Sequence, residues 1–292
     1  AAGQTMTGAS LRQLMNLVNK GILRRSPESD IYQIDELTRQ YAEEKLNQSP
    51  EVATIRDAHM HFYVKLLEDR TGSLYTREQR ETLRMVEADL NNIRAAWFRA
   101  VKYGKFDELS SAVNTLAHYF EMVGQYDEAE EVIAPAIESV GKIPQSDARD
   151  AALAHLNMWR SILQSTDGDP VKARESLETA ELLLNEETTT RQRYVLALAQ
   201  GMVQLNYGDP VESRQCFEQA AELLTQLGGG PETSRVLINL GRAYYFRLGA
   251  EEMNLEEARR ILAQARDVAL EQGDEYSLSV ALFCLGTVAM YS

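Results

Sequence analysis

The chain has 292 residues, of which 44% are hydrophobic and 25% are charged, an ordinary composition for a protein that folds in water. This length suits two domains or one elongated repeat array, and the 7 Pro and 17 Gly are too few for long disordered linkers. No apolar run approaches the roughly 18 residues of a membrane span, and no signal-peptide pattern opens the chain. Composition therefore predicts a cytoplasmic protein that does not enter a membrane.

Charge is distributed unevenly along the chain. Residues 1–105 contain 16 of the 30 basic and 14 of the 44 acidic residues, which leaves residues 106–292 with 14 basic and 30 acidic ones, a net charge of −16. Such an acidic segment repels phosphate backbones, so we expect no nucleic acid binding by residues 106–292. The two cysteines, Cys216 and Cys284, lack the spacing of a metal site and indicate buried thiols in a reducing compartment.

Residues 1–50 combine helical and strand patterns. Apolar side chains between residues 11 and 18 share one face of a predicted helix. Two short apolar runs follow at residues 21–24 and 31–34, separated by the turn signal Ser26–Asp30, and a further helix is predicted from Asp35 to about Leu46. Helix, strand, turn and strand form the second half of a winged helix. We therefore predict a partial winged helix with one small β-hairpin over residues 1–50, then a helical linker region over residues 51–105.

Winged-helix DNA binding by residues 10–34 is one interpretation of this segment, supported by Arg12, Lys20, Arg24 and Arg25. Residues 1–50 nevertheless contain six basic and six acidic residues, and DNA binding relies on neutralising phosphates. Salt-dependent retardation of DNA would favour this interpretation, and no retardation at low salt would exclude it.

A pattern recurs four times after residue 106: a small residue, another small residue twelve positions later, a large apolar residue and then Ala. The four units are Ala117, Ala129, Ile133 and Ala136; Ser161, Ala173, Leu177 and Ala180; Gly201, Ser213, Phe217 and Ala220; and Gly241, Ala258, Leu262 and Ala265. In the fourth unit the first gap is 17 residues, which places an insertion around Ala250–Asn254. A fifth unit starts at Leu285-Gly286 and stops after one helix.

Small residues suit the point where two antiparallel helices cross, because the backbones approach closely there and large apolar residues fill the space beside them. The turns Gly124–Asp127, Gly168–Pro170 and Gly208–Pro210 provide Gly to end one helix, and the last two also provide Asp and Pro to start the next. We predict an all-α fold in which residues 106–292 form an α-solenoid of four antiparallel helix hairpins plus one helix.

These units resemble the tetratricopeptide repeat (TPR). The resemblance is clearest in Leu240-Gly241 with Tyr244, Ala258, Leu262 and Ala265, and in Leu116 with Phe120, Ala129 and Ala136. The units lie 40 to 45 residues apart, against about 34 in the usual repeat, so additional residues lengthen the helices or the links between them. The resemblance implies a TPR-like solenoid that binds proteins.

The N-terminal segments resemble a second family. Residues 17–25 and 32–42 look like the winged helix that ends the nucleotide-binding core of STAND-type signal-transduction ATPases, and residues 87–96 resemble the helix before their repeats. In bacteria this family includes transcriptional regulators that contain TPRs. Asp35 stands where the family's motif has a His that approaches the nucleotide phosphate, and no Gly-x-x-x-x-Gly-Lys-Ser/Thr loop occurs. The resemblance implies that an ATPase module, if any, lies upstream and is absent from this chain.

No residue pattern indicates catalysis, a metal site or a cofactor. His59 and His61 point about 200° apart on a helix and cannot share a metal ion. Asp167-Gly168-Asp169 resembles the start of a calcium loop, but apolar residues occupy the remaining ligand positions. The sequence therefore predicts a protein that is not itself an enzyme.

Together these features predict the effector-sensing, protein-interaction region of a STAND-type regulator of transcription or signalling. In such a design the array holds or releases an ATPase core, according to what it binds. The alternative is a free-standing TPR scaffold or adaptor protein. The gene upstream of Ala1 separates the two hypotheses, because only the regulator requires a P-loop there.

The first helix of each hairpin lines the concave side in arrays of this family. By that rule the predicted partner-binding groove consists of Asn114, His118, His155, Met158, Met202, Arg235, Asn239, Arg242 and Tyr245, with Leu198 and Ile238 beside them. Arg235, Asn239 and Arg242 share one helical face and suit a carboxylate or phosphate. The Met and Tyr side chains favour a peptide or partner helix. Alternatively, the two arginines pair with Glu232 or with Glu251–Glu252.

The helix of the fifth unit has no following helix to cover it. Terminal repeats normally need a polar outer face, whereas residues near Tyr276–Met290 are mostly apolar. The sequence therefore predicts self-association through the C-terminal end.

Overall fold

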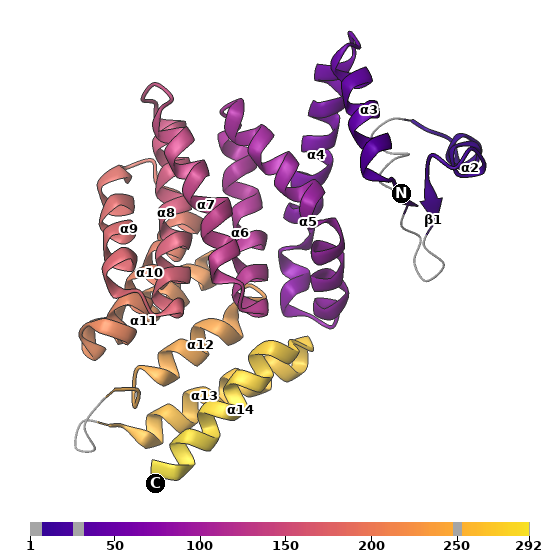
Figure 1. Cartoon of the computed structure of the whole chain (residues 1–292). Coiled ribbons are helices and arrows are strands. Elements are labelled where there is room, and N and C mark those ends of the chain that lie inside the picture. Colours follow the sequence, from indigo (N-terminus) through magenta and orange to yellow (C-terminus); the bar gives the residue numbers. More distant parts are fainter. Residues whose placement is uncertain (1–7, 26–31, 248–252, 292) are drawn as a thin grey trace.

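A computed structural model describes residues 8–25, 32–247 and 253–291. Thirteen α-helices and a short 3-10 helix dominate these residues, with two short strands near the N-terminus (Figure 1). The predicted all-α class is confirmed. The elements run α2 (Leu11–Asn19), β1 (Arg24–Arg25), β2 (Tyr32–Gln33), α3 (Glu36–Asn47), α4 (Val52–Arg70), η1 (Gly72–Tyr75), α5 (Gln79–Lys102), α6 (Phe106–Val123), α7 (Tyr126–Gly141), α8 (Asp147–Asp167), α9 (Pro170–Leu183), α10 (Thr190–Tyr207), α11 (Pro210–Gln226), α12 (Thr233–Arg242), α13 (Leu255–Gln272) and α14 (Glu275–Tyr291).

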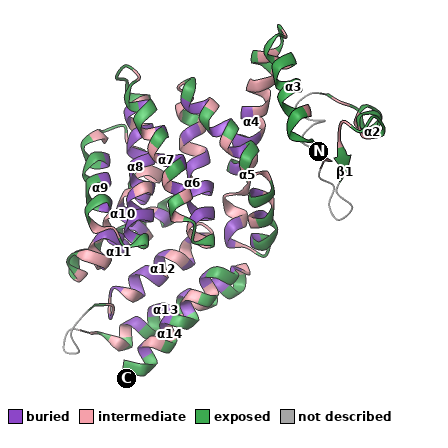
Figure 2. Ribbon diagram, viewed as in Figure 1, coloured by how far each residue is buried: buried purple, intermediate pink, exposed green. Residues whose placement is uncertain are grey.

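The N-terminal segment contains a helix, an antiparallel strand pair and a second helix. Strands β1 and β2 pair with Arg24 opposite Gln33 and Arg25 opposite Tyr32. A capping box between Ser10 and Gln13 starts α2. Neither α2 nor α3 contains a buried residue, and Figure 2 shows both helices largely exposed. The predicted turn at residues 26–30 lies outside the described residues.

The predicted hairpins are α6–α7, α8–α9, α10–α11 and α12–α13, and α14 is the single helix of the fifth unit. Small residues meet where the helices of a hairpin cross. Ser161 Oγ donates a hydrogen bond to the carbonyl oxygen of Ala173 at 2.7 Å, and Ser213 Oγ donates to that of Gly201 at 3.0 Å. Both bonds span the twelve residues of the sequence pattern, so the pattern marks the crossing of the two backbones.

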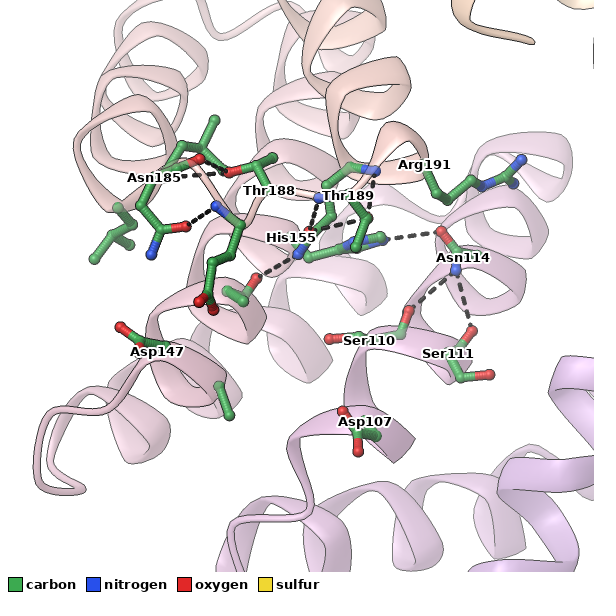
Figure 3. Close-up of a pocket in the computed structure, with 16 residues that line it drawn as sticks. Asp107, Ser110, Ser111, Asn114, Asp147, His155, Asn185, Thr188, Thr189 and Arg191 are labelled. Carbon is green, nitrogen blue, oxygen red and sulfur yellow. Dashed lines mark hydrogen bonds between the residues drawn. The ribbon is translucent and has the colours of Figure 1, made fainter. Parts of the chain in front are cut away.

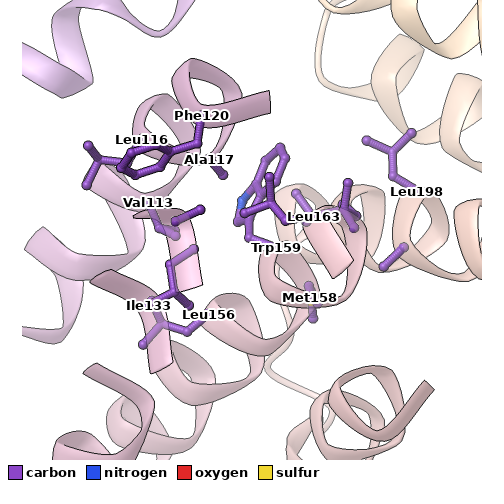
Figure 4. Packing of buried hydrophobic residues seen from close by; sticks show 14 of the residues in the cluster. Val113, Leu116, Ala117, Phe120, Ile133, Leu156, Met158, Trp159, Leu163 and Leu198 are labelled. Atoms are coloured by element: carbon purple, nitrogen blue, oxygen red, sulfur yellow. The ribbon is translucent and has the colours of Figure 1, made fainter. Parts of the chain in front are cut away.

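A hydrophobic core continues from hairpin to hairpin through the array. Figure 4 shows Trp159 of α8 within this core, with Ala117 of α6 and Leu163 of its own helix close to its ring. A smaller cluster joins α12, α13 and α14, and it includes Ala258, Leu262, Ala281 and Cys284. In Figure 1 these three helices run obliquely beneath the upright helices α6–α9. The last part of the array thus adds a second cluster, while Val236, Leu240, Ala243 and Ile261 belong to the core that continues through the array.

Residues 51–105, predicted as a helical linker region, form another helix pair. Helices α4 and α5 pack against one another, and α4 also packs along α6 as successive first helices do later in the array. Trp97 Nε1 in α5 donates to the carbonyl oxygen of Val132 in α7 at 3.1 Å, and Arg94 pairs with Glu128 at 2.8 Å. This pair therefore extends the array by one hairpin toward the N-terminus.

Candidate functional site

The first turns of α6, α8 and α10 surround a polar cavity of about 590 Å³ (Figure 3). The link between α9 and α10 closes one side. Asp107, Asp147 and Glu187 lie exposed at its edge, whereas Arg191 is half-buried in its wall. The cavity therefore has an acidic rim, and three first helices of successive hairpins contribute to it.

Asn114 and His155, two predicted groove residues, line this cavity. Asn114 Oδ1 accepts a hydrogen bond from Trp159 Nε1 at 2.9 Å and lies 3.0 Å from His155 Nε2. Burial and the nearby Arg191 guanidinium lower the pKa of His155 to about 4. The imidazole is therefore neutral at pH 7, and it offers hydrogen bonds without a charge.

The wall formed by α10 contains residues that the groove prediction omitted. Thr189 and Gln192 form a capping box at the start of α10, and Gln192 Nε2 also donates to the carbonyl oxygen of Ala151 at 3.3 Å. Arg191 pairs with Glu232 at 2.5 Å and lies over the Tyr194 ring. The Thr-x-x-Gln spacing could have located the start of this helix from the sequence, but nothing local identifies the partner of Arg191.

A second polar cluster lies where α12 meets α6. Arg235 forms a bidentate pair with Glu121, with nitrogen–oxygen distances of 2.7 and 2.9 Å. Its Nη1 is also 2.5 Å from His118 Nδ1, and its guanidinium lies 5.8 Å from the centre of the Trp159 ring. The side chains of Arg235 and Glu121 are only 12% and 11% exposed, so this ion pair is largely removed from water.

The contacts of His118 fix its tautomer. A guanidinium only donates hydrogen bonds, so His118 Nδ1 is the acceptor and the ring proton is on Nε2, which donates to the Tyr75 hydroxyl at 2.5 Å. Burial and the positive charge of Arg235 lower the pKa of His118 to about 4. Burial alone would raise the pKa of Glu121, but the Arg235 charge together with the other interactions of Glu121 with Arg235 and His118 outweighs burial, and the pKa is lowered. The cluster is therefore one carboxylate–guanidinium pair beside a neutral imidazole.

Most of the predicted groove residues lie inside the array. His118, His155, Met158, Met202, Asn239 and Tyr245 are buried, as are Leu198 and Ile238, whereas Asn114, Arg235 and Arg242 are half-buried. The physical reason is packing within the array: α6, α8 and α10 pack along one another, and Ile238 and Tyr245 pack against α13 and α14. Contact of these residues with a partner stays a prediction.

Arg235 and Arg242 do not act together in this structure. Arg235 turns toward α6, whereas Arg242 donates to Asn239 Oδ1 at 3.4 Å and lies over the Phe246 ring. Glu232, proposed as an alternative partner for both arginines, pairs instead with Arg191. Glu251 and Glu252 lie outside the described residues. The two guanidiniums therefore belong to different surroundings, and a shared carboxylate or phosphate between them is not supported by this geometry.

Asp35, at the motif position where a histidine would approach a nucleotide, caps a helix. Its Oδ1 accepts a hydrogen bond from the Thr38 backbone N–H at 3.0 Å, and its Oδ2 accepts from the Thr38 hydroxyl. These hydrogen bonds lower the pKa of Asp35. The carboxylate therefore has a local structural role at the start of α3.

The residues that the structure describes contain no group of three or more His, Cys, Asp or Glu side chains that could hold a metal ion. None of the helices that the structure describes is both long and apolar enough to cross a bilayer.

No protein-family model matches the sequence, and no curated protein matches it. Among solved structures, the chain is similar to a Signal Transduction ATPase with Numerous Domains (STAND) protein with a tetratricopeptide repeat sensor from Pyrococcus horikoshii, with a TM-score of 0.52 and 12% sequence identity. The match covers 99% of this chain and 44% of the other, so the chain spans less than half of that protein's length. At this identity the likeness concerns the fold, and this chain shares the helical repeat architecture of a protein with a TPR sensor.

Proposed function

We propose that this chain is the effector-sensing, protein-binding repeat region of a STAND-type regulator of transcription or signalling, and that it catalyses no reaction of its own. The observation that supports the proposal is the extent of the structural likeness, which covers 99% of the chain. It thus includes the N-terminal helix, strand pair and second helix as well as the hairpins. We interpret that segment as the remaining part of a winged helix, which a free-standing scaffold would not need.

The polar cavity between α6, α8 and α10 is the proposed site for the effector or partner. Its acidic rim favours a peptide or protein segment with basic side chains, because complementary charges speed association and disfavour wrong partners. The neutral His155 and Asn114 add uncharged hydrogen-bonding groups at the bottom of the cavity. In this proposal an occupied cavity shifts an attached ATPase core between two states.

The test uses the complete open reading frame from which this chain derives. We expect a P-loop upstream of Ala1, and we expect deletion of residues 106–292 to change the ATP hydrolysis rate of the full-length protein by about 5-fold or more, as typical allosteric coupling does. A full-length variant with Lys substituted for Asp107 and Asp147 keeps the array but alters the rim, and it should lose partner binding. Absence of a P-loop would reject the regulator and leave the free-standing TPR scaffold.

DNA binding by residues 10–34 is the second alternative, and one observation favours it. Arg12, Lys20, Arg24 and Arg25 are all exposed. Retardation of a labelled duplex that weakens steeply with salt would support this alternative. Unchanged mobility at low salt would reject it without affecting the sensor proposal.

A further inference from the structure

The two ends of the array meet through a polar contact between the start of α5 and the turn that joins α13 to α14. Gln79 Nε2 donates to Asp274 Oδ1 at 2.8 Å, and Gln79 Oε1 accepts from the Tyr276 backbone N–H at 3.0 Å. Arg80 pairs with Glu275 at 2.5 Å on the outside. Asp274 is fully buried. Residues almost 200 positions apart are therefore held together by hydrogen bonds and one exposed ion pair.

The Arg235–Glu121 pair forms a second connection between the last helices of the array and its earlier part. We call these two connections the closure of the array. This pair joins α12 to α6, which lie 114 residues apart in sequence. Successive first helices earlier in the array pack along their length, whereas α12 and α10 touch only sparingly. The end of the array thus departs from the regular stacking, and in doing so it places Arg235 against α6 and Trp159 of α8.

The link between α11 and α12 has the geometry of a hinge. Gly228 and Gly229 have φ angles of 92° and 75°, which residues with a side chain rarely adopt, and no atom lies within 4 Å of the position of a Cβ on either residue. The two amides donate to the carbonyl oxygens of Thr225 and Leu224 at the end of α11, and no other part of the chain packs where a side chain would stand.

Beyond this link, α12, α13 and α14 share a smaller hydrophobic cluster, while Val236, Leu240 and Ala243 in or next to α12 and Ile261 in α13 keep the apolar contact with the main core. These three helices are called the terminal unit below. Their shared cluster lets them turn as one body about Gly228–Gly229 while α12 stays in contact with α11.

We propose that the terminal unit is a hinged latch that closes the array, with Arg235 as an internal ligand in an acidic, aromatic socket made by Glu121, His118 and Trp159. In the closed form Arg235 occupies that socket, so an external cation cannot enter. In the open form Glu121 and Trp159 become accessible to an arginine or lysine side chain of a partner. This inference goes beyond the proposed function, because closure is a property of this chain and applies equally to a free-standing scaffold.

The ion pairs that hold the terminal unit in the closed form stabilise that form only weakly, so a partner can release it. A buried ion pair loses much of its Coulomb energy to desolvation of both charges, so it specifies an arrangement without stabilising it strongly. Exposed pairs such as Arg80–Glu275 contribute little. The contacts that join α5 to the start of α14 and α6 to α12 are polar, and polar interfaces within a chain resemble transient protein contacts, for which relative motion is expected. A partner that supplies a cation for Glu121 replaces the internal pair without leaving a buried charge alone.

Pulsed electron spin resonance on the 292-residue chain tests the latch. Spin labels are attached at Glu81→Cys in α5 and Glu271→Cys in α13, both exposed positions, with Cys216→Ser and Cys284→Ala to avoid other labelling. We expect one short distance for this labelled chain. Arg235→Ala removes the internal ligand, and Gln79→Ala independently leaves Asp274 without its partner from α5. Each variant should convert at least half of the short-distance population into a longer one.

The matched control is Arg160→Ala, which removes the partly buried Arg160–Glu130 pair within the array rather than across the closure. It should keep the short distance. If both Arg235→Ala and Gln79→Ala also keep it with unchanged circular dichroism, the latch is rejected. If Arg235→Ala unfolds the array, Gln79→Ala decides between the two outcomes. The readout does not involve ATP, so a failure here is distinct from a failure of the sensor proposal.

Discussion

At the residue scale, the hairpins depend on side chains that are small enough for two backbones to approach. Gly201 lies under the ring of Phe217, and a Cβ at this position would be 2.5 to 2.9 Å from three ring carbons. Phe217 is fully buried and cannot move away without disturbing its neighbours. The same constraint applies to Gly241, where a Cβ would be 2.7 Å from Leu262 Cγ.

We expect Gly201→Ala to destabilise the chain relative to Gly286→Ala by about 1–3 kcal/mol, the usual effect of overpacking a core. Both changes gain the same helix propensity, about 1 kcal/mol. Gly286 has no atom within 4 Å of the Cβ position, so its variant should keep that gain. Urea unfolding of the two variants provides the comparison. Equal midpoints would show that the crossing at Gly201 tolerates a methyl group.

Two buried histidines predict a loss of stability in mild acid. The pKa values of His118 and His155 are lowered to about 4, below the value of about 6.5 in an unfolded chain, so the unfolded state binds the protons first. The free energy of unfolding should therefore fall as the pH falls from 6.5 to 4, by about 3 kcal/mol for each histidine. Glu121, with its lowered pKa, adds a further loss below that range.

Urea unfolding at a series of pH values from 8 to 4 measures this dependence. His155→Gln retains a hydrogen-bonding side chain but cannot titrate, so about half of the pH dependence between 6.5 and 4 should disappear. If the stability of the unmodified chain were constant over that range, the folded state would not hold the histidines neutral down to pH 4, and their pKa values would be those of the unfolded chain.

The role of a residue could be predicted from the sequence where its contacts are with residues close to it along the chain. The twelve-residue step predicted the crossings, because it encodes the distance along two helices to one contact. It could not predict that Arg235 binds Glu121 and His118, since those partners lie more than a hundred residues away and follow no period. The sequence placed Arg235 in a partner-binding groove or, alternatively, beside Glu232 or Glu251–Glu252, whereas the placement of α12 against α6 provides Glu121 as its partner.

At the element scale, the hairpins with short Gly-containing turns could be predicted from the sequence, whereas the hairpin α4–α5 could not. Gly124 and Gly168 end their helices with φ angles of 70° and 101°, as expected for left-handed caps. Helices α4 and α5 are joined instead through η1, and they lack the small-residue step. A hydrogen bond from the Tyr63 hydroxyl to Asp89 Oδ1 at 3.1 Å connects them. Without the pattern, residues 51–105 could be predicted as helical but not as a hairpin.

Helix α14 is the element for which we predict self-association. One face of this helix remains exposed and bears Tyr276, Leu282, Phe283, Gly286 and Met290. Glu275 is its one charged residue, so two copies of this face meet without charge repulsion. A second copy of α14, related by a two-fold axis, can place each Phe283 beside the open space at Gly286 of the other copy.

Phe283→Glu should abolish this association, because it puts a charge at the centre of the apolar face. Leu182→Glu is the matched control, since Leu182 on α9 is 87% exposed and Phe283 is 76% exposed. Sedimentation velocity over a range of concentrations should show a concentration-dependent species for the unmodified chain and for the control, and a monomer for Phe283→Glu. A strict monomer of the unmodified chain at high concentration would reject the prediction.

At the scale of the whole molecule, closure alters how the array should unfold. An open solenoid has contacts between neighbouring repeats alone, so its ends fray and its unfolding spreads along the chain in parts. The connections from α5 to α14 and from α6 to α12 give this array contacts of very long sequence separation. Because of these contacts, the stability of each end of the array depends on the folded state of the other end.

The cooperativity of unfolding therefore reports on closure. We expect the unmodified chain to lose its helices in one calorimetric transition, whereas Gln79→Ala should separate an earlier transition of α12–α14 from that of the remaining array. Two transitions in the unmodified chain would mean that the ends are already independent. A repeat array joined at its ends thus behaves thermodynamically like a globular domain, and breaking a few polar contacts returns it to the piecewise behaviour of a linear polymer.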